Sequence, residues 1–174
     1  MHTRTLGFVI LIFFYLPASA DVPAAYRTIA AEYSHPPELL FSVALTESGH
    51  QYKHLFLPWP WTVNHAGKGI FFNTREEAYA YCVELLDKGD TNFDVSVMQI
   101  NWYWHGKRFA SLWDAFDPYT NIRVGAQILW EEYQASGSYD QAIGFYHSRN
   151  VRRAARYRER VQHMLSRVSA GRVR

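Results

Sequence analysis

The sequence predicts a mostly α-helical domain of α+β class, with one small β-hairpin inserted between helices. Three observations support this fold class. Apolar residues recur at helical spacing in most segments, and proline or glycine marks several of the segment ends. Two short runs, TVN (residues 62–64) and IFFN (residues 70–73), flank a glycine-containing turn, as in a hairpin. No internal repeat or linker-like segment divides the chain, so we expect one domain.

The first twenty residues have the three parts of a secretory signal. Arg4 supplies a positive start, Leu6–Leu16 is uninterruptedly apolar, and Ala18-Ser19-Ala20 forms a small-residue cleavage site. The apolar run is too short for a membrane span, which needs about 20 helical residues. We therefore divide the chain into a signal peptide (1–20), one folded domain (21–168) and a basic flexible tail (169–174), with no transmembrane segment after cleavage.

Helices are expected at seven places along the rest of the chain. Prolines near the first turn, early acids and terminal glycines set the proposed ends. The expected segments are Pro23–Tyr33, Pro36–Ser48, Thr74–Lys88, Val97–Trp104, Pro118–Ala135, 138–148 and Val151–Val168.

Glu47 is the first candidate functional residue. Residues three, four, seven and eight positions before it are all apolar, so a helical Glu47 projects from the face that meets the core. Burial favours a protonated carboxyl, and the negative end of the helix dipole adds to this effect. Both raise the pKa toward the range of a general acid. The structural alternative, a Glu47 paired with a buried arginine or capping a loop, stays open at this point.

The sequence gives less support to a metal site or to a catalytic nucleophile than to Glu47 as a general acid. Glu47 with His50, and Glu32 with His35, have the Glu-x-x-His spacing of di-iron bundles, but both histidines fall at or beyond helix ends. Cys82, the only cysteine, lies in a predicted helix and is expected to be buried and unreactive. The chain contains no G-x-S-x-G and no phosphate-binding glycine loop. We expect no metal and no cofactor.

Positive charge is concentrated at the C-terminal end, although the net charge of the chain is only +2. Residues 149–174 carry nine arginines and one acid. Such a segment forms either a solvated helix face or a surface for an anionic partner. Because the predicted signal would export the protein, nucleic acid is the least expected of these partners. Aromatic residues make up 17% of the chain and gather in LPWPWTV and INWYWHGKRFASLW, where they suit core packing or a cleft that stacks flat ligand faces.

Four short motifs occur in order: ESG at residues 47–49, SVMQIN at 96–101, AIGFYHS at 142–148 and ARYRERV at 155–161. This ordered set resembles the soluble lytic transglycosylase family of peptidoglycan-cleaving enzymes, over roughly residues 25 to 165. The resemblance implies a lysozyme-like fold in which the hairpin follows the catalytic helix. Three positions depart from the family pattern, because Ser96 stands where glycine is usual and His147-Ser148 where Asn-Ala is common.

By this resemblance Glu47 is the catalytic acid and base. The resemblance also assigns a set of substrate-binding residues. Ser48 positions the sugar or Glu47, Met98 and Gln99 line the cleft, and Gln99 bonds an acetamido group.

The third and fourth motifs complete the set. By the same resemblance Tyr146 and Tyr157 approach Glu47, and His147 takes the place of an amide that contacts the substrate. Asp94 has two interpretations: an N-cap of the SVMQIN helix, which we favour, or a second carboxylate opposite Glu47.

The resulting expectation is a periplasmic, monomeric lytic transglycosylase that cuts the bond between N-acetylmuramic acid and N-acetylglucosamine in peptidoglycan. Its product would carry a 1,6-anhydromuramoyl end. A partnership with an envelope-spanning secretion or conjugation machine follows from the resemblance alone. Two alternatives remain: a lysozyme-type hydrolase of the same bond, and a non-catalytic glycan-binding or assembly protein on the same fold.

Overall fold

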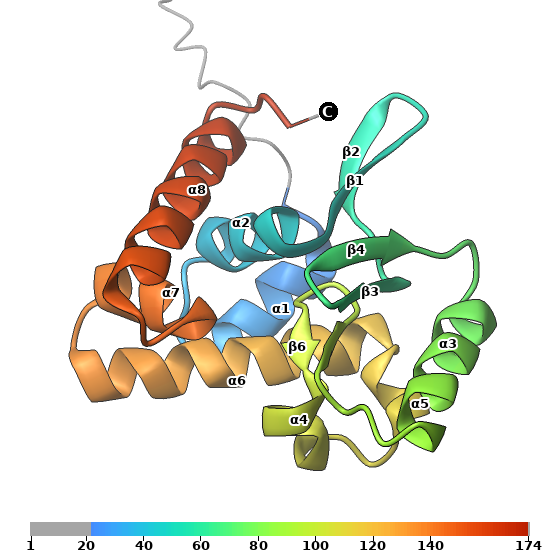
Figure 1. The fold of residues 1–174 in the computed structure, drawn as a ribbon. Helices are drawn as coiled ribbons and strands as arrows, with labels where there is room; N and C mark the ends of the chain where they lie inside the picture. Colours follow the sequence, from blue (N-terminus) through green and yellow to red (C-terminus); the bar gives the residue numbers. More distant parts are fainter. Residues whose placement is uncertain (1–21, 174) are drawn as a thin grey trace, which may run out of the picture.

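The computed structural model describes residues 22–173, and helices predominate over strands, which confirms a mixed and mostly α class (Figure 1). The predicted signal peptide lies outside the described residues. Eight α-helices and one short 3-10 helix occur in the described part. The α-helices are α1 (Ala24–Glu32), α2 (Pro37–Ser48), α3 (Arg75–Asp87), α4 (Trp102–His105), α5 (Leu112–Ala115), α6 (Pro118–Ser136), α7 (Tyr139–His147) and α8 (Val151–Ser169); the 3-10 helix is Gly106–Arg108.

Six strands form two antiparallel sheets. The first sheet is a hairpin of β1 (Gly49–Tyr52) and β2 (Leu55–Pro58) directly after α2. The second has the order β4-β3-β5-β6, with the remaining strands β3 (Thr62–His65), β4 (Lys68–Phe71), β5 (Phe93–Val95) and β6 (Ile100–Asn101). The predicted hairpin is therefore confirmed as β3–β4, but it belongs to a larger sheet.

Helix α2 runs through the middle of the molecule (Figure 1). It packs against α1 and α8, and the β1–β2 hairpin leaves from its C-terminal end. Only three of its residues, Pro37, Glu38 and Glu47, are not fully buried. A helix buried on nearly all sides must be mainly apolar, which explains the run PELLFSVAL. Glu47 is the only acidic residue in the last turn of this helix.

Several helix ends follow the sequence signals. Pro37 is the first residue of α2, and Gly137 ends α6 with a left-handed φ of 69°. The Thr74 hydroxyl accepts a hydrogen bond from the Glu77 N–H at the start of α3. Cys82, on the inner face of α3, is buried and free, and burial raises its thiol pKa to about 12.

The predicted helix Val97–Trp104 is wrong. Residues 96–99 form a tight turn, Ile100–Asn101 is strand β6, and only the last part of the segment enters α4. Two residues with positive φ, Ser96 at 64° and Gln99 at 45°, do not fit a continuous helix. Hairpin β1–β2 was not expected either, because its sequence lacks a glycine turn.

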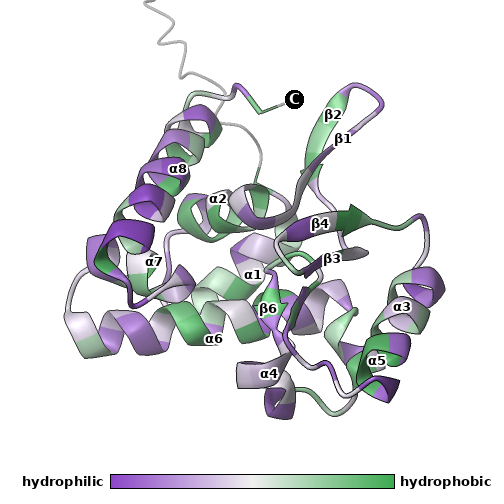
Figure 2. Ribbon diagram, in the orientation of Figure 1, coloured by the Kyte–Doolittle hydropathy of each residue, from purple (hydrophilic) through white to green (hydrophobic). Residues whose placement is uncertain are grey.

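The C-terminal segment is amphipathic. Helix α8 shows mostly hydrophilic residues on its outer side in Figure 2, whereas Tyr157 and Val161 on its inner side are buried. After α8, the Arg172 N–H donates to the Arg167 carbonyl, and Val173 packs against the core. The described part of the predicted flexible tail therefore folds back onto the domain. None of the helices between residues 22 and 173 combines the length and the apolar character that crossing a membrane requires.

Candidate active site

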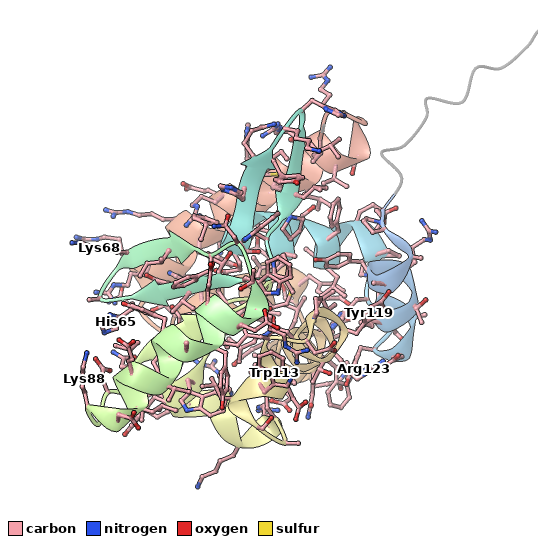
Figure 3. The ribbon with its side chains drawn as sticks, turned by 90° about the vertical axis from the view of Figure 1, so that its right-hand side faces the viewer. His65, Lys68, Lys88, Trp113, Tyr119 and Arg123 are labelled. Carbon is pink, nitrogen blue, oxygen red and sulfur yellow. The ribbon has the colours of Figure 1, made fainter. Side chains whose placement is uncertain are left out.

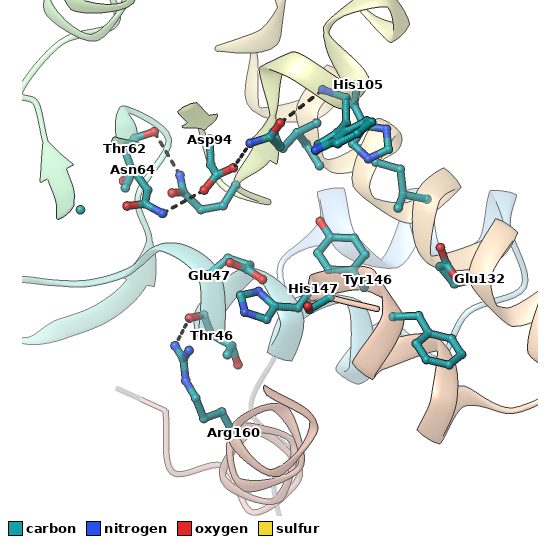
Figure 4. A pocket seen from close by; sticks show the side chains of 18 of the residues that line it. Thr46, Glu47, Thr62, Asn64, Asp94, His105, Glu132, Tyr146, His147 and Arg160 are labelled. Atoms are coloured by element: carbon teal, nitrogen blue, oxygen red, sulfur yellow. Dashed lines mark hydrogen bonds between the residues drawn. The ribbon is translucent and has the colours of Figure 1, made fainter. Parts of the chain in front are cut away.

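Glu47 lies at the wall of a pocket of about 810 Å³ (Figure 4). The pocket is bounded by the end of α2, by the four-stranded sheet, and by helices α4, α6, α7 and α8. Elements from the whole length of the chain thus meet around this one carboxylate.

The environment of Glu47 raises its pKa from 4.5 to about 7. Burial is the main cause, since it disfavours the charged form. Among its neighbours, Asp94 adds to the increase, while the hydroxyl of Tyr157 and the guanidinium of Arg160 act against it. A carboxyl with a pKa near neutrality is able to give and take a proton at ordinary pH, which is the requirement for a general acid that later acts as a base.

Asp94 does not cap a helix, so the interpretation favoured from the sequence is wrong. It lies in the middle of β5, paired with Asn64 of β3 on one side and Asn101 of β6 on the other. The two amide side chains each donate to one Asp94 oxygen, both at 2.9 Å. Burial nevertheless raises the Asp94 pKa, against the effect of these two donors. Figure 4 shows Asp94 on the wall of the same pocket as Glu47, so the pocket contains a second carboxylate.

The turn 96–99 connects the sheet to the pocket. The Gln99 N–H donates to the Ser96 carbonyl at 3.1 Å, and the Ser96 N–H donates to Thr62 at 2.8 Å. Ser96 is fully buried in a left-handed conformation, which explains why glycine is expected at this position. Its hydroxyl has no hydrogen-bond partner within residues 22–173.

Gln99 lines the pocket as predicted. Its side-chain N–H groups donate to the carbonyls of Thr62 at 3.1 Å and Ser96 at 2.8 Å. Both amide hydrogens are therefore used within the protein, and the amide oxygen is the atom left to accept a hydrogen bond from a ligand.

Met98 does not line the pocket. Its side chain is fully buried against Gly125 of α6, where even a Cβ would approach within 2.7 Å of the Met98 side chain. The backbone of Met98 is fixed at both ends, because its N–H donates to the Asn121 side chain and its carbonyl accepts from the Tyr146 hydroxyl, each at 2.8 Å. Met98 therefore holds the turn in place and leaves ligand contact to its neighbour Gln99.

Ser48 is also buried, and it is not among the residues that line the pocket. Its hydroxyl lies 2.8 Å from the Val97 carbonyl and 3.2 Å from the Ala44 carbonyl. The serine thus ties the end of α2 to the turn 96–99. It positions Glu47 relative to Gln99, and it does not contact a sugar in this arrangement.

Tyr146, His147 and Tyr157 gather on the side of the pocket formed by α7 and α8. Tyr146 and His147 line the pocket, whereas Tyr157 is buried behind them, with its ring stacked on His147 at 4.6 Å and on Tyr146 at 6.4 Å. Within the described chain, the Tyr157 hydroxyl makes no hydrogen bond of acceptable geometry, yet it lies close enough to influence the pKa of Glu47. Burial, then Arg160, lower the pKa of His147, so its imidazole is favoured in the neutral form.

Two important residues were not found from the sequence. Arg160 of α8 lines the pocket and donates to the Thr46 carbonyl at 3.0 Å, which places a positive charge at the negative end of α2. Asn121, fully buried in α6, accepts from Met98 and donates to the Val95 and Ala115 carbonyls. A polar residue on the apolar face of the segment NIRVGAQIL was the available signal for Asn121. Arg160 lies within the motif ARYRERV, but nothing there separates it from the neighbouring arginines.

The histidines near Glu47 have other partners. His50 stacks on Phe71 at 4.4 Å, and His54 lies in the turn between β1 and β2. Upstream, the His35 ring nitrogens contact the Tyr139 hydroxyl and the Ala126 carbonyl. No group of three or more His, Cys, Asp or Glu residues capable of holding a metal ion occurs in the part of the chain that the structure covers.

The arrangement combines a carboxyl of raised pKa, a second carboxylate, an amide oxygen and tyrosine and histidine rings in one open pocket. Such a set is suited to acid and base chemistry on a polar, neutral ligand. A scan against protein-family models and searches of curated proteins and of solved structures found no match for this chain.

Proposed function

We propose that this protein is a periplasmic enzyme that cleaves the glycan strand of peptidoglycan, acting as a lytic transglycosylase on a lysozyme-like fold. The observation that carries the proposal is the position of Glu47, a carboxyl with a pKa of about 7 on the wall of a large pocket. Gln99, Tyr146 and His147, which the motifs select together with Glu47, line the same pocket.

In this proposal Glu47 first acts as an acid. Its proton passes to the oxygen of the bond between N-acetylmuramic acid and N-acetylglucosamine as that bond breaks, and the electron pair leaves with the oxygen. The resulting Glu47 carboxylate then takes the proton from the 6-hydroxyl of the muramoyl residue. That oxygen forms a new bond to the anomeric carbon of its own sugar, which gives the 1,6-anhydro end and restores protonated Glu47. The free oxygen of Gln99 is suited to accept a hydrogen bond from an acetamido N–H.

The test is to treat purified peptidoglycan with the mature protein and to analyse the released fragments by mass spectrometry. The expected products carry anhydromuramoyl ends, and Glu47→Gln abolishes their release. Glu84→Gln, a change at an exposed position of α3, serves as the matched control and leaves release unchanged. Cleavage by Glu47→Gln at the rate of the unchanged protein would refute the assignment of Glu47.

One observation favours a second candidate, a lysozyme-type hydrolase of the same bond. Asp94 shares the pocket with Glu47, and hydrolytic glycosidases use two carboxylates. In that case the fragments are heavier than the anhydro products by one water molecule. Release of only the heavier fragments would replace the transglycosylase proposal by the hydrolase. The absence of any release, together with retained glycan binding, would favour a non-catalytic glycan-binding protein.

A further inference from the structure

A second hollow lies next to the catalytic pocket, between β2 and α8. We call it the α8 groove. Its volume is about 480 Å³, and its lining residues are Leu45, Thr46, Gly49, Phe56, Arg156, Glu159, Arg160, His163 and Met164. Thr46 and Arg160 line both hollows, so the α8 groove adjoins the pocket that contains Glu47, with the Arg160–Thr46 hydrogen bond at their boundary. Figure 1 shows the end of α2 between α8 and the β1–β2 hairpin.

The rim of the α8 groove is mainly positive. Arg156, Arg160 and His163 are exposed residues on one side of α8, and Glu159 is the only acid among the lining residues. Arg153, one turn before Arg156, continues the row toward the catalytic pocket and lowers the pKa of His147 there.

The arginines of this row differ in their contacts from the other arginines of the C-terminal segment. Arg149 and Arg158 form ion pairs with Glu132 and Asp140. By contrast, no acid within residues 22–173 pairs with the side chain of Arg153 or Arg156. Unpaired, exposed arginines in a row are available to bind anionic groups of a ligand.

The floor of the α8 groove is apolar. Leu45 of α2, Phe56 of β2 and Met164 of α8 contribute to it. Gly49 allows Phe56 to approach the end of α2, because a Cβ at residue 49 would lie 2.3 Å from both the Phe56 ring and the Leu45 carbonyl oxygen. An apolar floor with a cationic rim fits a short peptide that carries carboxylates and small apolar side chains.

We propose that the α8 groove binds the acidic peptide stem attached to a muramoyl unit whose sugar occupies the catalytic pocket. This inference rests on the proposed function, because only peptidoglycan places a carboxylate-bearing peptide beside the sugar that Glu47 would attack. In stem-bearing glycan the lactyl carboxyl of the muramoyl unit is held in the amide bond to the stem, so the sugar part is uncharged and gains little from arginines. The stem carboxylates, by contrast, form charge-assisted hydrogen bonds with them. The row Arg153, Arg156 and Arg160 therefore gives the enzyme a preference for glycan that still carries its peptides.

The test measures binding of the full-length mature protein to two soluble glycan probes. One probe carries its peptide stems. The other has been stripped of them by an amidase, and the lactyl carboxyls that this exposes are capped as methylamides, so that it carries neither stems nor charge. All proteins carry Glu47→Gln, so that the glycan stays intact. The Arg153→Gln, Arg156→Gln pair is compared with Lys88→Gln, Lys107→Gln, which removes two other exposed cations and serves as the charge-matched control; Lys88 is labelled in Figure 3. Both arginines are exposed, and thermal unfolding of each variant verifies that the fold is retained.

The arginine pair is expected to weaken binding of the stem-bearing probe by about threefold to tenfold, since two charge contacts are lost and solvent weakens each of them. Binding of the stripped probe stays unchanged, and the lysine control affects neither probe. Equal weakening for both probes, or no weakening for either, overturns the proposal. A variant that loses binding to anionic lipid vesicles while keeping its preference for the stem-bearing probe also overturns it, and assigns the row to a membrane surface.

The failure of this inference is distinguishable from the failure of the proposed function. Binding is measured without catalysis, so a stem preference that depends on the arginines supports the α8 groove even if the unchanged protein releases no fragments. Release of anhydromuramoyl fragments by a protein with no stem preference rejects the α8 groove and leaves the enzyme assignment standing.

Discussion

Replacing Glu47 by Gln is expected to stabilise the folded protein, and to do so only at neutral and alkaline pH. Burial raises the pKa of Glu47 from 4.5 to about 7, so the folded protein holds this proton more tightly than the unfolded chain does. The associated stability is fully present below the unfolded pKa of 4.5 and is lost as the pH rises through about 7. Glutamine is neutral at every pH, so the Glu47→Gln protein keeps the stability that the unchanged protein loses as the pH rises.

The difference between a pKa of 4.5 and one of about 7 sets an upper limit of about 3 kcal/mol on the effect. Glu47 keeps part of its surface open to the pocket, where solvent screens the charge, so we expect about 1–3 kcal/mol above neutral pH. A change of this size is a large fraction of the free energy of unfolding of a single domain.

Urea unfolding of both proteins at about pH 4.5 and about pH 8.5 measures the effect, because these values bracket the transition. The free energies of unfolding should agree at the lower pH and differ by the stated amount at the higher pH. A difference that is the same at both pH values would show that Glu47 has an ordinary pKa, and would refute the physical basis of its assignment as an acid.

Three further substitutions test neighbours of Glu47. Asp94→Asn removes a negative charge and should lower the Glu47 pKa, which moves the alkaline limit of fragment release to lower pH. Arg160→Gln removes a positive charge and should move that limit to higher pH, whereas a purely structural role would reduce the rate without moving it. Asn121→Leu deprives the Met98 N–H and two buried carbonyls of their partner and should cost about 3 kcal/mol or more in urea unfolding, since each of the three unsatisfied groups costs about 1–3 kcal/mol. An unshifted pH limit in Asp94→Asn or Arg160→Gln would contradict the role given to that residue. So would a loss of less than about 1 kcal/mol in the free energy of unfolding of Asn121→Leu.

The longer helices were predictable because their signals are local, whereas the four-residue helices α4 and α5 were not. Proline at the start of α2, the Thr74 cap of α3 and Gly137 after α6 act within one turn of the chain, and all three occur at the predicted places. The burial of Glu47 among apolar neighbours also followed from spacing within a single helix. Its raised pKa could therefore be expected before the rest of the pocket was known.

The sheet and the turn before β6 were not predictable by such rules. Strands β5 and β6 are too short to show alternation. They are strands because β5 pairs with β3, some 30 residues earlier, and β6 pairs with β5. The same pairing sets Asp94 between Asn64 and Asn101, a contact that depends on register and leaves no local pattern. The segment SVMQIN was expected to be helical, but two positive φ angles make residues 96–99 a turn, and residues 100–101 pair with β5 as a strand.

Three carboxyls line the pocket, and that of Glu132 is paired with Arg149. The other two, Glu47 and Asp94, differ in what surrounds them, and that difference bears on the proposed mechanism. Each Asp94 oxygen accepts an amide hydrogen bond, and such donors favour the ionised form even though burial opposes it. Burial is the largest influence at both carboxyls and raises the pKa of each, and at Glu47 the negative charge of Asp94 adds to the increase. In the proposed mechanism Glu47 donates the proton, and the two amide donors favour an Asp94 that supplies negative charge to a cation-like transition state. That division of roles serves cleavage in either proposed reaction. The outcome then depends on what reaches the anomeric carbon first: the muramoyl 6-hydroxyl, or a water molecule that Asp94 activates.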